Sequence, residues 1–380
     1  MNKVYLPTSE QMDTTLENLS RIAGALSAKA DISSWEGIER VVKSGNAPNL
    51  FPIGTQFTVY HDTYGDMVFD VVAHDHLKSS IDDDAHTMTL MCHSVIETVQ
   101  FDNSEAFYYA EAELPAGFYN FTIASAYSAW AAGTYQFTLT KALPKGGQLC
   151  ISGFADSAIT NMKVVAYASR TATTATESVA ITTGNTGKSL GTFGVELNHI
   201  ERVSYGSNNY KESAIRQFLN STATAGSVWS PQTKFDRPPS ETTPLAGFMN
   251  GLESGFAAVV GEVIVPCSAN NIYESPDSTV VKGTKYSVID KFYLASHGEI
   301  LGASADVLDD GSVQFPYYEG ATDADRIKYY TKTGQASYWW LRSARQGQTN
   351  SVRIVANDGS LNITNRANTV TGLTFACTIV

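Results

Sequence analysis

Histidine and aspartate residues crowd the first quarter of the chain, and their side chains could bind a metal ion. The cluster comprises His61, His74, His76, His86 and His93 together with Asp62, Asp66, Asp75, Asp82, Asp83 and Asp84. A zinc or calcium site needs ligands that converge at defined spacing. His74-Asp75-His76, however, falls at a predicted strand end, where neighbouring residues face opposite ways, and Asp82–Asp84 is typical of a solvated turn. We therefore predict no metal here, and no cofactor.

Two further patterns resemble catalytic motifs but lack essential positions. Gly184-Asn185-Thr186-Gly187-Lys188-Ser189 imitates the end of a phosphate loop, but Thr182 stands where the full motif needs glycine. The four cysteines are far apart and form no CxxC pair, which favours buried free thiols over a redox or zinc motif. No nucleophile elbow is present either. These patterns indicate a binding protein and not an enzyme.

The composition excludes several other classes. The chain has 380 residues, of which 43% are hydrophobic, enough for at least one sizeable core and two or three domains. A formal net charge of -12 argues against binding to nucleic acid or to an anionic membrane. The chain starts without a Sec-type apolar region, and no stretch approaches the roughly 20 apolar residues of a spanning helix. We expect no membrane insertion.

The last forty-odd residues have a different chemistry from the rest of the chain. The segment Ser337–Val380 contains no lysine and no glutamate but is dense in Asn, Ser, Thr, Gln and Arg. Short polar side chains of this kind suit an adaptable binding surface, because they form hydrogen bonds in many geometries at low ordering cost. The segment contains four arginines (Arg342, Arg345, Arg353 and Arg366) but one acidic residue, Asp358. The segment is therefore predicted to form a basic patch that attracts an acidic partner.

Residues 1–48 are predicted to form a helical region for attachment or oligomerisation. A capping box at Thr8–Gln11 precedes apolar residues at helical spacing, namely Met12, Leu16, Leu19, Ile22, Ala23 and Leu26. This seam suits a short coil that would make the protein a homo-oligomer, such as a trimer, while packing onto its own domain is the alternative. A second short helix is predicted around Trp35–Val42.

From Phe51 the hydrophobic period changes to two, which predicts strands. The alternating residues are Phe57 and Val59, then Met67, Phe69 and Val71, then Met88 and Leu90. Residues 104–198 are richer in Gly, Thr, Ser and Ala, and we interpret them as an inserted β-sandwich. Helices are then predicted at about Lys211–Asn220 and from Met249 to Val259, with an ordered loop between them. Strands are expected again near Val263 and from Tyr286 to Leu294.

Two sequence stretches resemble a known family. Asn208–Ser221 (NNYKESAIRQFLNS) and Tyr338–Ser343 (YWWLRS) occur together in bacterial and phage proteins with a C-type-lectin-like fold. The resemblance covers roughly Phe51–Asn103 and His199–Val380. It implies an α+β chain in which residues 49–103 and 199–380 form a C-type-lectin-like (formylglycine-generating-enzyme-like) domain, interrupted by the insert at 104–198.

The resemblance is greatest to the variable proteins of diversity-generating retroelements, in which adenine-directed mutagenesis rewrites codons near the gene's end. It implies a variable region at about 343–369 that binds a bacterial cell-surface protein or glycan, from a phage tail virion or an extracellular position. Formylglycine-generating enzymes share the fold but hold copper with a close cysteine pair. Cys92 and Cys150 lie on opposite sides of a predicted domain boundary, so the resemblance does not extend to that activity.

Residue type and alternation divide the variable region into scaffold and surface. Trp339, Trp340 and Arg342 are predicted to support the site, and Asp358-Gly359-Ser360 is predicted to be a turn. The predicted ligand-binding positions are Arg345, Gln346, Gln348, Asn350, Ser351, Ile354, Ala356, Asn357, Asn362, Thr364, Asn365 and Asn368.

The alternative hypothesis is a bacterial surface or secreted carbohydrate-binding module whose site lies in the insert. Aromatic residues that could stack on sugars there are Tyr108, Tyr109, Tyr119, Tyr127 and Trp130. Their alternation with small polar residues favours a role in the sandwich core for most of them.

Overall fold

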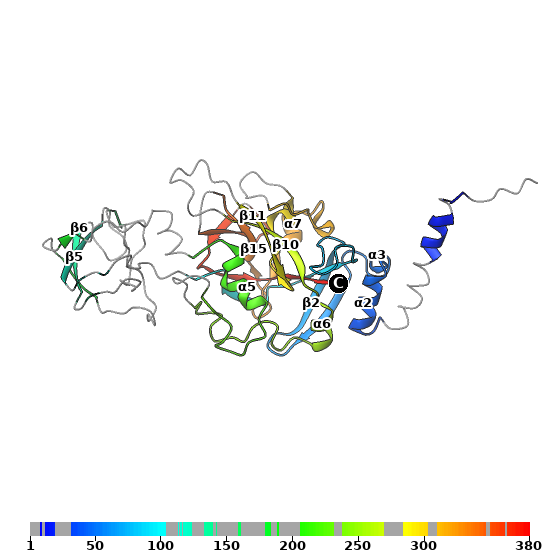
Figure 1. Cartoon of the computed structure of the whole chain (residues 1–380), viewed down its shortest axis with the longest axis horizontal. Helices are drawn as coiled ribbons and strands as arrows, with labels where there is room; N and C mark the ends of the chain where they lie inside the picture. The colour runs from blue at the N-terminus through cyan, green and yellow to red at the C-terminus, as the bar shows by residue number, and fades with distance from the viewer. Residues whose placement is uncertain are drawn as a thin grey trace, which may run out of the picture.

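Two five-stranded sheets and several short helices form the body that holds the C-terminal segment (Figure 1). The secondary structure is α+β, as predicted. The structure is a computed structural model, and it describes residues 8–9, 12–19, 32–103, 113, 115, 117–123, 133–139, 142, 159–160, 179–183, 188–189, 206–231, 238–269, 284–302, 310–346, 350–361 and 363–380.

The first sheet joins the start of the body to the end of the chain. Its strands, in spatial order, are β1 (Gln56–His61), β2 (Gly65–His74), β3 (Met88–Cys92), β19 (Ala376–Ile379) and β12 (Phe292–Tyr293). All neighbours are antiparallel, and β19 pairs with β3 with Cys377 opposite Leu90. The strands predicted from Phe51 are present, but the period of two holds in burial only for β1 and the start of β2, because Phe69–Ala73 and all of β3 are buried.

The second sheet holds the segment predicted to bind a ligand. Its strands, in spatial order, are β17 (Ile363–Arg366), β16 (Ser351–Val355), β15 (Trp339–Ala344), β18 (Val370–Leu373) and β4 (Glu97–Gln100). β15 lies at the centre, antiparallel to β16 and parallel to β18. A Cβ atom at Gly372 would lie 2.3 Å from the carbonyl oxygen of Tyr338, so only glycine allows this close approach.

Short helices and two-stranded ribbons surround the sheets. The helices are α2 (Trp35–Lys43), α3 (Ala47–Leu50), α5 (Ala214–Leu219), α6 (Ser254–Val259) and α7 (His297–Leu301), with 3-10 turns η2 (Tyr210–Glu212), η3 (Pro316–Tyr318) and η4 (Asp323–Arg326). The ribbons are β10 (Val263–Ala269) with β11 (Thr284–Asp290), and β13 (Lys328–Tyr329) with β14 (Ala336–Ser337). Each helix is too short to be stable alone, so packing and caps must hold it.

Helix caps explain most of the helix boundaries. Ser34 accepts a hydrogen bond from the backbone N–H of Gly37 and begins α2, which confirms the helix predicted around Trp35–Val42. The helix predicted from Lys211 starts as η2, and α5 begins only after Ser213 caps it. The helix predicted from Met249 is shorter than expected, because only α6 is helical.

The described strands of the insert pair only with one another. They are β5 (Gly117–Ile123), β6 (Gly133–Leu139), β7 (Ile159–Thr160), β8 (Val179–Thr183) and β9 (Lys188–Ser189). A separate sheet agrees with an inserted β unit, while the sandwich and its bounds at 104–198 stay predictions. The aromatic side chains proposed to stack on sugars lie outside the described residues, as does Cys150.

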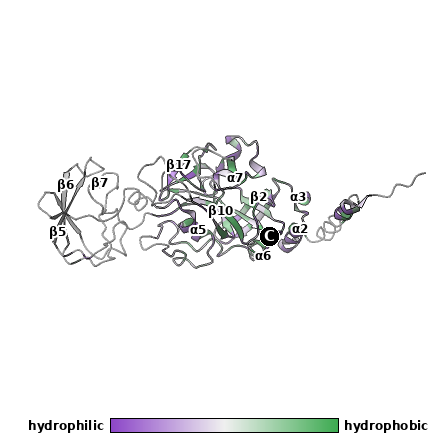
Figure 2. Ribbon diagram, turned by 45° about the horizontal axis from the view of Figure 1, so that its top comes forward, coloured by the Kyte–Doolittle hydropathy of each residue, from purple (hydrophilic) through white to green (hydrophobic). Residues whose placement is uncertain are grey.

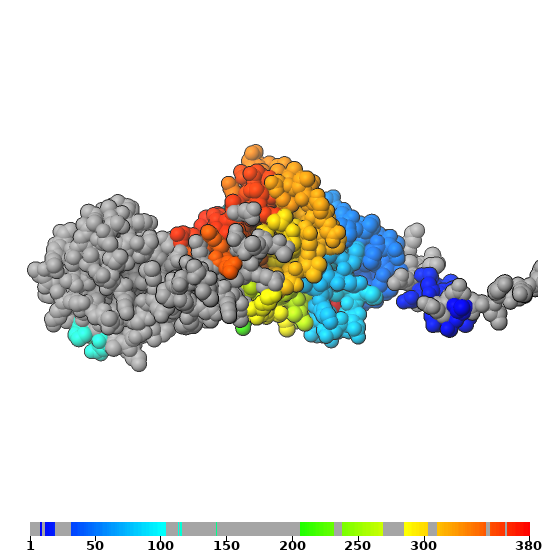
Figure 3. Space-filling model, turned by 90° about the horizontal axis from the view of Figure 1, so that it is seen from above, coloured from blue at the N-terminus to red at the C-terminus, as the bar shows by residue number. Residues whose placement is uncertain are grey.

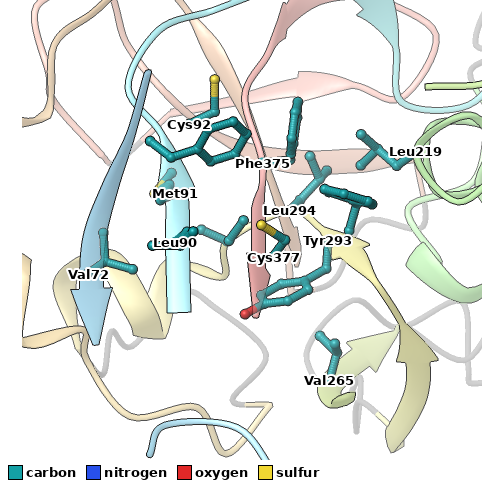
Figure 4. Packing of buried hydrophobic residues seen from close by; sticks show 14 of the residues in the cluster. Val72, Leu90, Met91, Cys92, Leu219, Val265, Tyr293, Leu294, Phe375 and Cys377 are labelled. Carbon is teal, nitrogen blue, oxygen red and sulfur yellow. The ribbon is translucent and has the colours of Figure 1, made fainter. Parts of the chain in front are cut away.

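One hydrophobic core joins the two sheets and the helices. Figure 4 shows part of it, where Phe375 and Cys377 of the C-terminal segment pack among Leu90, Met91 and Leu294. Phe248, Phe292 and Phe375 meet edge to face, with ring centroids 4.5–5.8 Å apart. The end of the chain is thus part of the core.

The helix predicted at the N-terminus is present over residues 12–19, and its apolar side chains are exposed. The exposed fractions are 53% for Met12, 64% for Leu16 and 56% for Leu19. Figure 2 shows hydrophobic and hydrophilic residues together on this helix. Within the described residues, no helix combines the length and apolar character needed to cross a bilayer.

Candidate functional site

Strand β15 is a rigid support at the centre of the second sheet. Trp339 and Trp340 are fully buried, and their indole N–H groups donate to the backbone carbonyls of Arg326 (3.2 Å) and Val99 (2.9 Å). Burying an indole without a partner is costly, so these bonds fix both rings in one orientation. The structure therefore buries these two residues as predicted for the scaffold of the site.

Arg342 is the third predicted scaffold residue, and it forms a buried ion pair. Its Nη1 and Nη2 donate to the Glu299 carboxylate at 2.6 and 2.9 Å, and its Nε donates to the Pro266 carbonyl at 2.9 Å. Burial alone would raise the pKa of Glu299, but the Arg342 charge and a hydrogen bond from His76 lower it to about 2. Arg342 thus ties β15 to α7 and β10.

The prediction of an exposed basic patch made of four arginines is wrong. Arg342 is neutralised in the interior by Glu299, and Arg353 is also buried. Only Arg345 and Arg366 reach the surface. Counting charges along the sequence failed because the balancing carboxylate comes from a distant segment, α7.

Four of the predicted ligand-binding positions are interior, which corrects the prediction. Asn350, Ser351, Ile354 and Ala356 are all buried. The reason is the place of β16: it lies between β15 and β17, and every residue of it is buried, so both of its faces are covered. Alternation along a strand marks a solvent face only when one face of the sheet is open.

Backbone hydrogen bonds also hold the start of β16 in place. The Asn350 carbonyl accepts from the Ala367 N–H at 2.8 Å, and the Ser351 carbonyl accepts from the Asn208 amide at 3.0 Å. Asn208 belongs to the first stretch that resembles the known family. Its role here is structural, since it anchors the chain ahead of α5 to the second sheet.

The remaining described positions reach the surface to different degrees. Gln346 and Asn357 are exposed, and Arg345, Thr364, Asn365 and Asn368 are half-buried. Gln348 and Asn362 lie outside the described residues. Asn357 follows β16 and belongs to the turn with Asp358 and Gly359, the latter at a φ of 85°, so the predicted turn is confirmed.

We give the name C-terminal patch to five polar residues: Arg345 and Gln346, which follow β15, Asn365 and Arg366, which end β17, and Asn368 in the turn after β17. The Arg345 N–H donates to the Ser351 carbonyl at 2.9 Å, and Ser351 lies opposite Arg366 in the pairing of β16 with β17. In the space-filling view, residues late in the chain reach the surface of the body (Figure 3).

The insert leaves and re-enters the body beside this patch. The Asp102 N–H donates to the Ala367 carbonyl, and the Ser207 N–H donates to the Asp102 carboxylate, both at 3.0 Å. Gly206 has a φ of 80°, and a Cβ atom there would lie 3.0 Å from the Asn103 carbonyl oxygen. The two ends of the insert are therefore adjacent, and both border the turn after β17.

The five histidines between residues 61 and 93 do not converge on a common site. Each ring has its own partner: His61 with the Phe248 carbonyl, His74 with the Phe51 carbonyl, His76 with Glu299, His86 with Asp75, and His93 with Asp70. In the described part of the chain, no three His, Cys, Asp or Glu side chains are grouped as a metal site would require. The pattern of residues that first suggested chemistry is thus a set of separate structural contacts.

The three cysteines in the described part of the chain are buried free thiols, as predicted. They are Cys92, Cys267 and Cys377. Burial raises the pKa of the Cys92 thiol to about 11 and that of Cys267 to about 12. A thiol reacts as its thiolate, so these two are unreactive at neutral pH.

Two cavities lie away from the C-terminal patch, and no residue of either was predicted to bind a ligand. One, of about 640 Å³, lies between α2, the loop around Ile81 and the turn before β10. The other, of about 560 Å³, lies between α5, the loop that follows it and the end of β11. The lining of each cavity comes from segments far apart in sequence, so no local sequence pattern indicates either one.

The comparisons with known proteins give one match. A family described as a domain of unknown function (DUF6273) matches residues 186–380, which is just over half of the chain and contains both β15 and the C-terminal patch. No curated protein and no solved structure matches. The chain belongs to the DUF6273 family.

Proposed function

We propose that the protein is a ligand-binding protein that displays a changeable surface, the C-terminal patch, on a C-type-lectin-like scaffold. The resemblance of Tyr338–Ser343 to the family of variable proteins motivates this proposal. The fold is compatible with it, because β19 at the chain end pairs with β3 near the start of the body. We assign no catalytic role to the patch.

One observation carries the proposal. Exposed and half-buried polar residues gather at the end of a sheet whose central strand is fully buried and fixed by an ion pair. Side chains on such a surface can be replaced without disturbing the core, while the strands keep the geometry of the surface constant.

The burial of β16 reduces the set of proposed contact residues. We retain the described positions that reach the surface, namely Arg345, Gln346, Asn357, Thr364, Asn365 and Asn368, and we remove the buried positions Asn350, Ser351, Ile354 and Ala356. A residue that is fully enclosed cannot touch a ligand unless the sheet opens.

We further propose a phage or prophage tail adhesin whose partner is a bacterial cell-surface protein or glycan. The exposed apolar side chains of Met12, Leu16 and Leu19 follow a four-then-three spacing, which is the spacing of a coiled-coil seam. Because these side chains find no cover in the described body, a second and third copy of the chain are the proposed occupants of the seam.

An exchange between two family members that bind different bacterial strains tests this function. Residues 343–369 of one protein replace those of the other, and binding of the purified proteins to both strains is measured by flow cytometry. We expect strain preference to follow the exchanged segment. Preference that stays with the recipient protein would contradict the proposal. A nearby reverse transcriptase gene with an adenine-variable template repeat would support it independently.

A further inference from the structure

The cavity beside α5 has walls with the chemistry of a ligand site. It is a hollow of about 560 Å³ that is open to solvent and lined mainly by polar groups. Its lining comes from α5, from the loop 220–230 and from Ile289 and Asp290 at the end of β11. Figure 1 shows α5 with this loop at the edge of the body. The cavity is distinct from the C-terminal patch.

A hydrogen-bond donor in this cavity has no acceptor among the described residues. The Gln217 Nε2 atom is shielded from solvent, and no described residue accepts a hydrogen bond from it. The other end of the same amide is engaged, because Oε1 accepts from the Ser230 N–H at 2.9 Å. This bond fixes the orientation of the amide. A buried donor left without an acceptor costs roughly 1–3 kcal/mol, which an acceptor on a ligand would recover.

The charged residues of the cavity neutralise each other. Arg216 donates from Nε and Nη2 to the Asp290 carboxylate at 2.8–3.0 Å, and its Nη1 donates to the Lys211 carbonyl. The other lining side chains are amides, hydroxyls and small apolar groups. The walls therefore offer no uncompensated charge to an ionic ligand.

Ile289 at the end of β11 also lines the cavity. Along β11 the side chains alternate, with Val288 and Asp290 buried and Ser287 and Ile289 outward. Ile289 is 54% exposed on this outward face. The hydroxyl and amide groups of the lining suit the hydroxyl groups of a sugar residue.

We propose that this cavity binds a neutral polyhydroxylated ligand, a sugar residue, through Gln217 Nε2 and the hydroxyl of Thr222. This site is separate from the proposed variable surface, so either proposal can be wrong without affecting the other. It would give the body a fixed glycan contact that does not change when the C-terminal patch is altered.

The test uses the full chain and a panel of glucose, galactose, mannose and N-acetylglucosamine, with affinity measured by saturation-transfer NMR. Gln217→Glu keeps the acceptor for Ser230 but removes the donor, and Thr222→Val removes an exposed hydroxyl with little risk to folding. We expect at least one sugar to bind, with affinity reduced about tenfold by Gln217→Glu and about threefold by Thr222→Val. The matched control is Gln335→Glu, an exposed glutamine outside the cavity, which should leave affinity unchanged.

Two results would overturn the proposal. One is that none of the four sugars binds the wild-type chain at millimolar concentration. The other is that a sugar binds but both variants, shown to be folded by their unfolding midpoints, retain wild-type affinity. Neither result depends on residues 343–369.

Discussion

At the residue scale, the buried pair of Arg342 and Glu299 has the largest expected energetic effect. Both side chains are fully enclosed, so removing one leaves the other charge without compensation. Arg342→Met should reduce the free energy of unfolding by about 3–5 kcal/mol, measured by denaturant titration. Arg366→Met, at an exposed arginine two strands away, is the control and should change it by less than about 0.5 kcal/mol. Equal effects of the two changes would refute the role assigned to Arg342.

The same pair predicts a dependence of stability on acid. The folded-state pKa of Glu299, about 2, lies below its ordinary value of 4.5, so its contribution is present above about pH 4.5 and is lost as pH falls toward 2. Glu299→Gln should destabilise the protein by about 3 kcal/mol at pH 7, and this difference should shrink steadily below pH 4.5. Unfolding midpoints from pH 7 to pH 2.5 check this, and a constant difference would contradict it.

At the element scale, strands and caps were predicted well where local patterns decide the structure. The alternation in β1, the helix at Trp35 and the turn at Asp358–Ser360 are confirmed, because each depends on neighbouring residues. The site was predicted less well. Whether β16 is exposed depends on its neighbours in the sheet, which come from other segments, and so Asn350, Ser351, Ile354 and Ala356 were wrongly placed at the surface. The partner of Arg342 was missed for the same reason.

The N-terminal helix gives an element-scale prediction. Changing Met12, Leu16 and Leu19 together to serine removes the apolar seam at positions that are already exposed, so the body should remain folded. We expect the wild-type chain to be trimeric at micromolar concentration and the triple variant to be monomeric, by light scattering coupled to size exclusion. A matched variant with serine at Asp13, Glu17 and Asn18, which lie beside the seam, should stay trimeric. A wild-type chain that is monomeric at this concentration would contradict the proposed coil.

At the scale of the whole molecule, the body should fold without the insert. Asn103 and Gly206 lie against each other, so a link of about three glycines can replace the insert at 104–198 together with residues 199–205 without stretching the chain. We expect the shortened protein to retain a cooperative unfolding transition, with a free energy of unfolding within about 1 kcal/mol of the full chain. Loss of that transition would show that the insert is needed for the core.

The central claim is that the C-terminal patch can vary while the sheet beneath it cannot. The most direct test is a comparison of two libraries displayed on the same chain, one randomised at Gln346, Asn365 and Asn368 and one at Ser351, Ile354 and Ala356. Folding is measured by protease resistance, and the folded members are then sorted on bacterial strains. The proposal predicts that most members of the first library fold and that they differ in strain preference, while most members of the second do not fold. A first library that mostly unfolds, or whose folded members all bind as the wild type does, would contradict it.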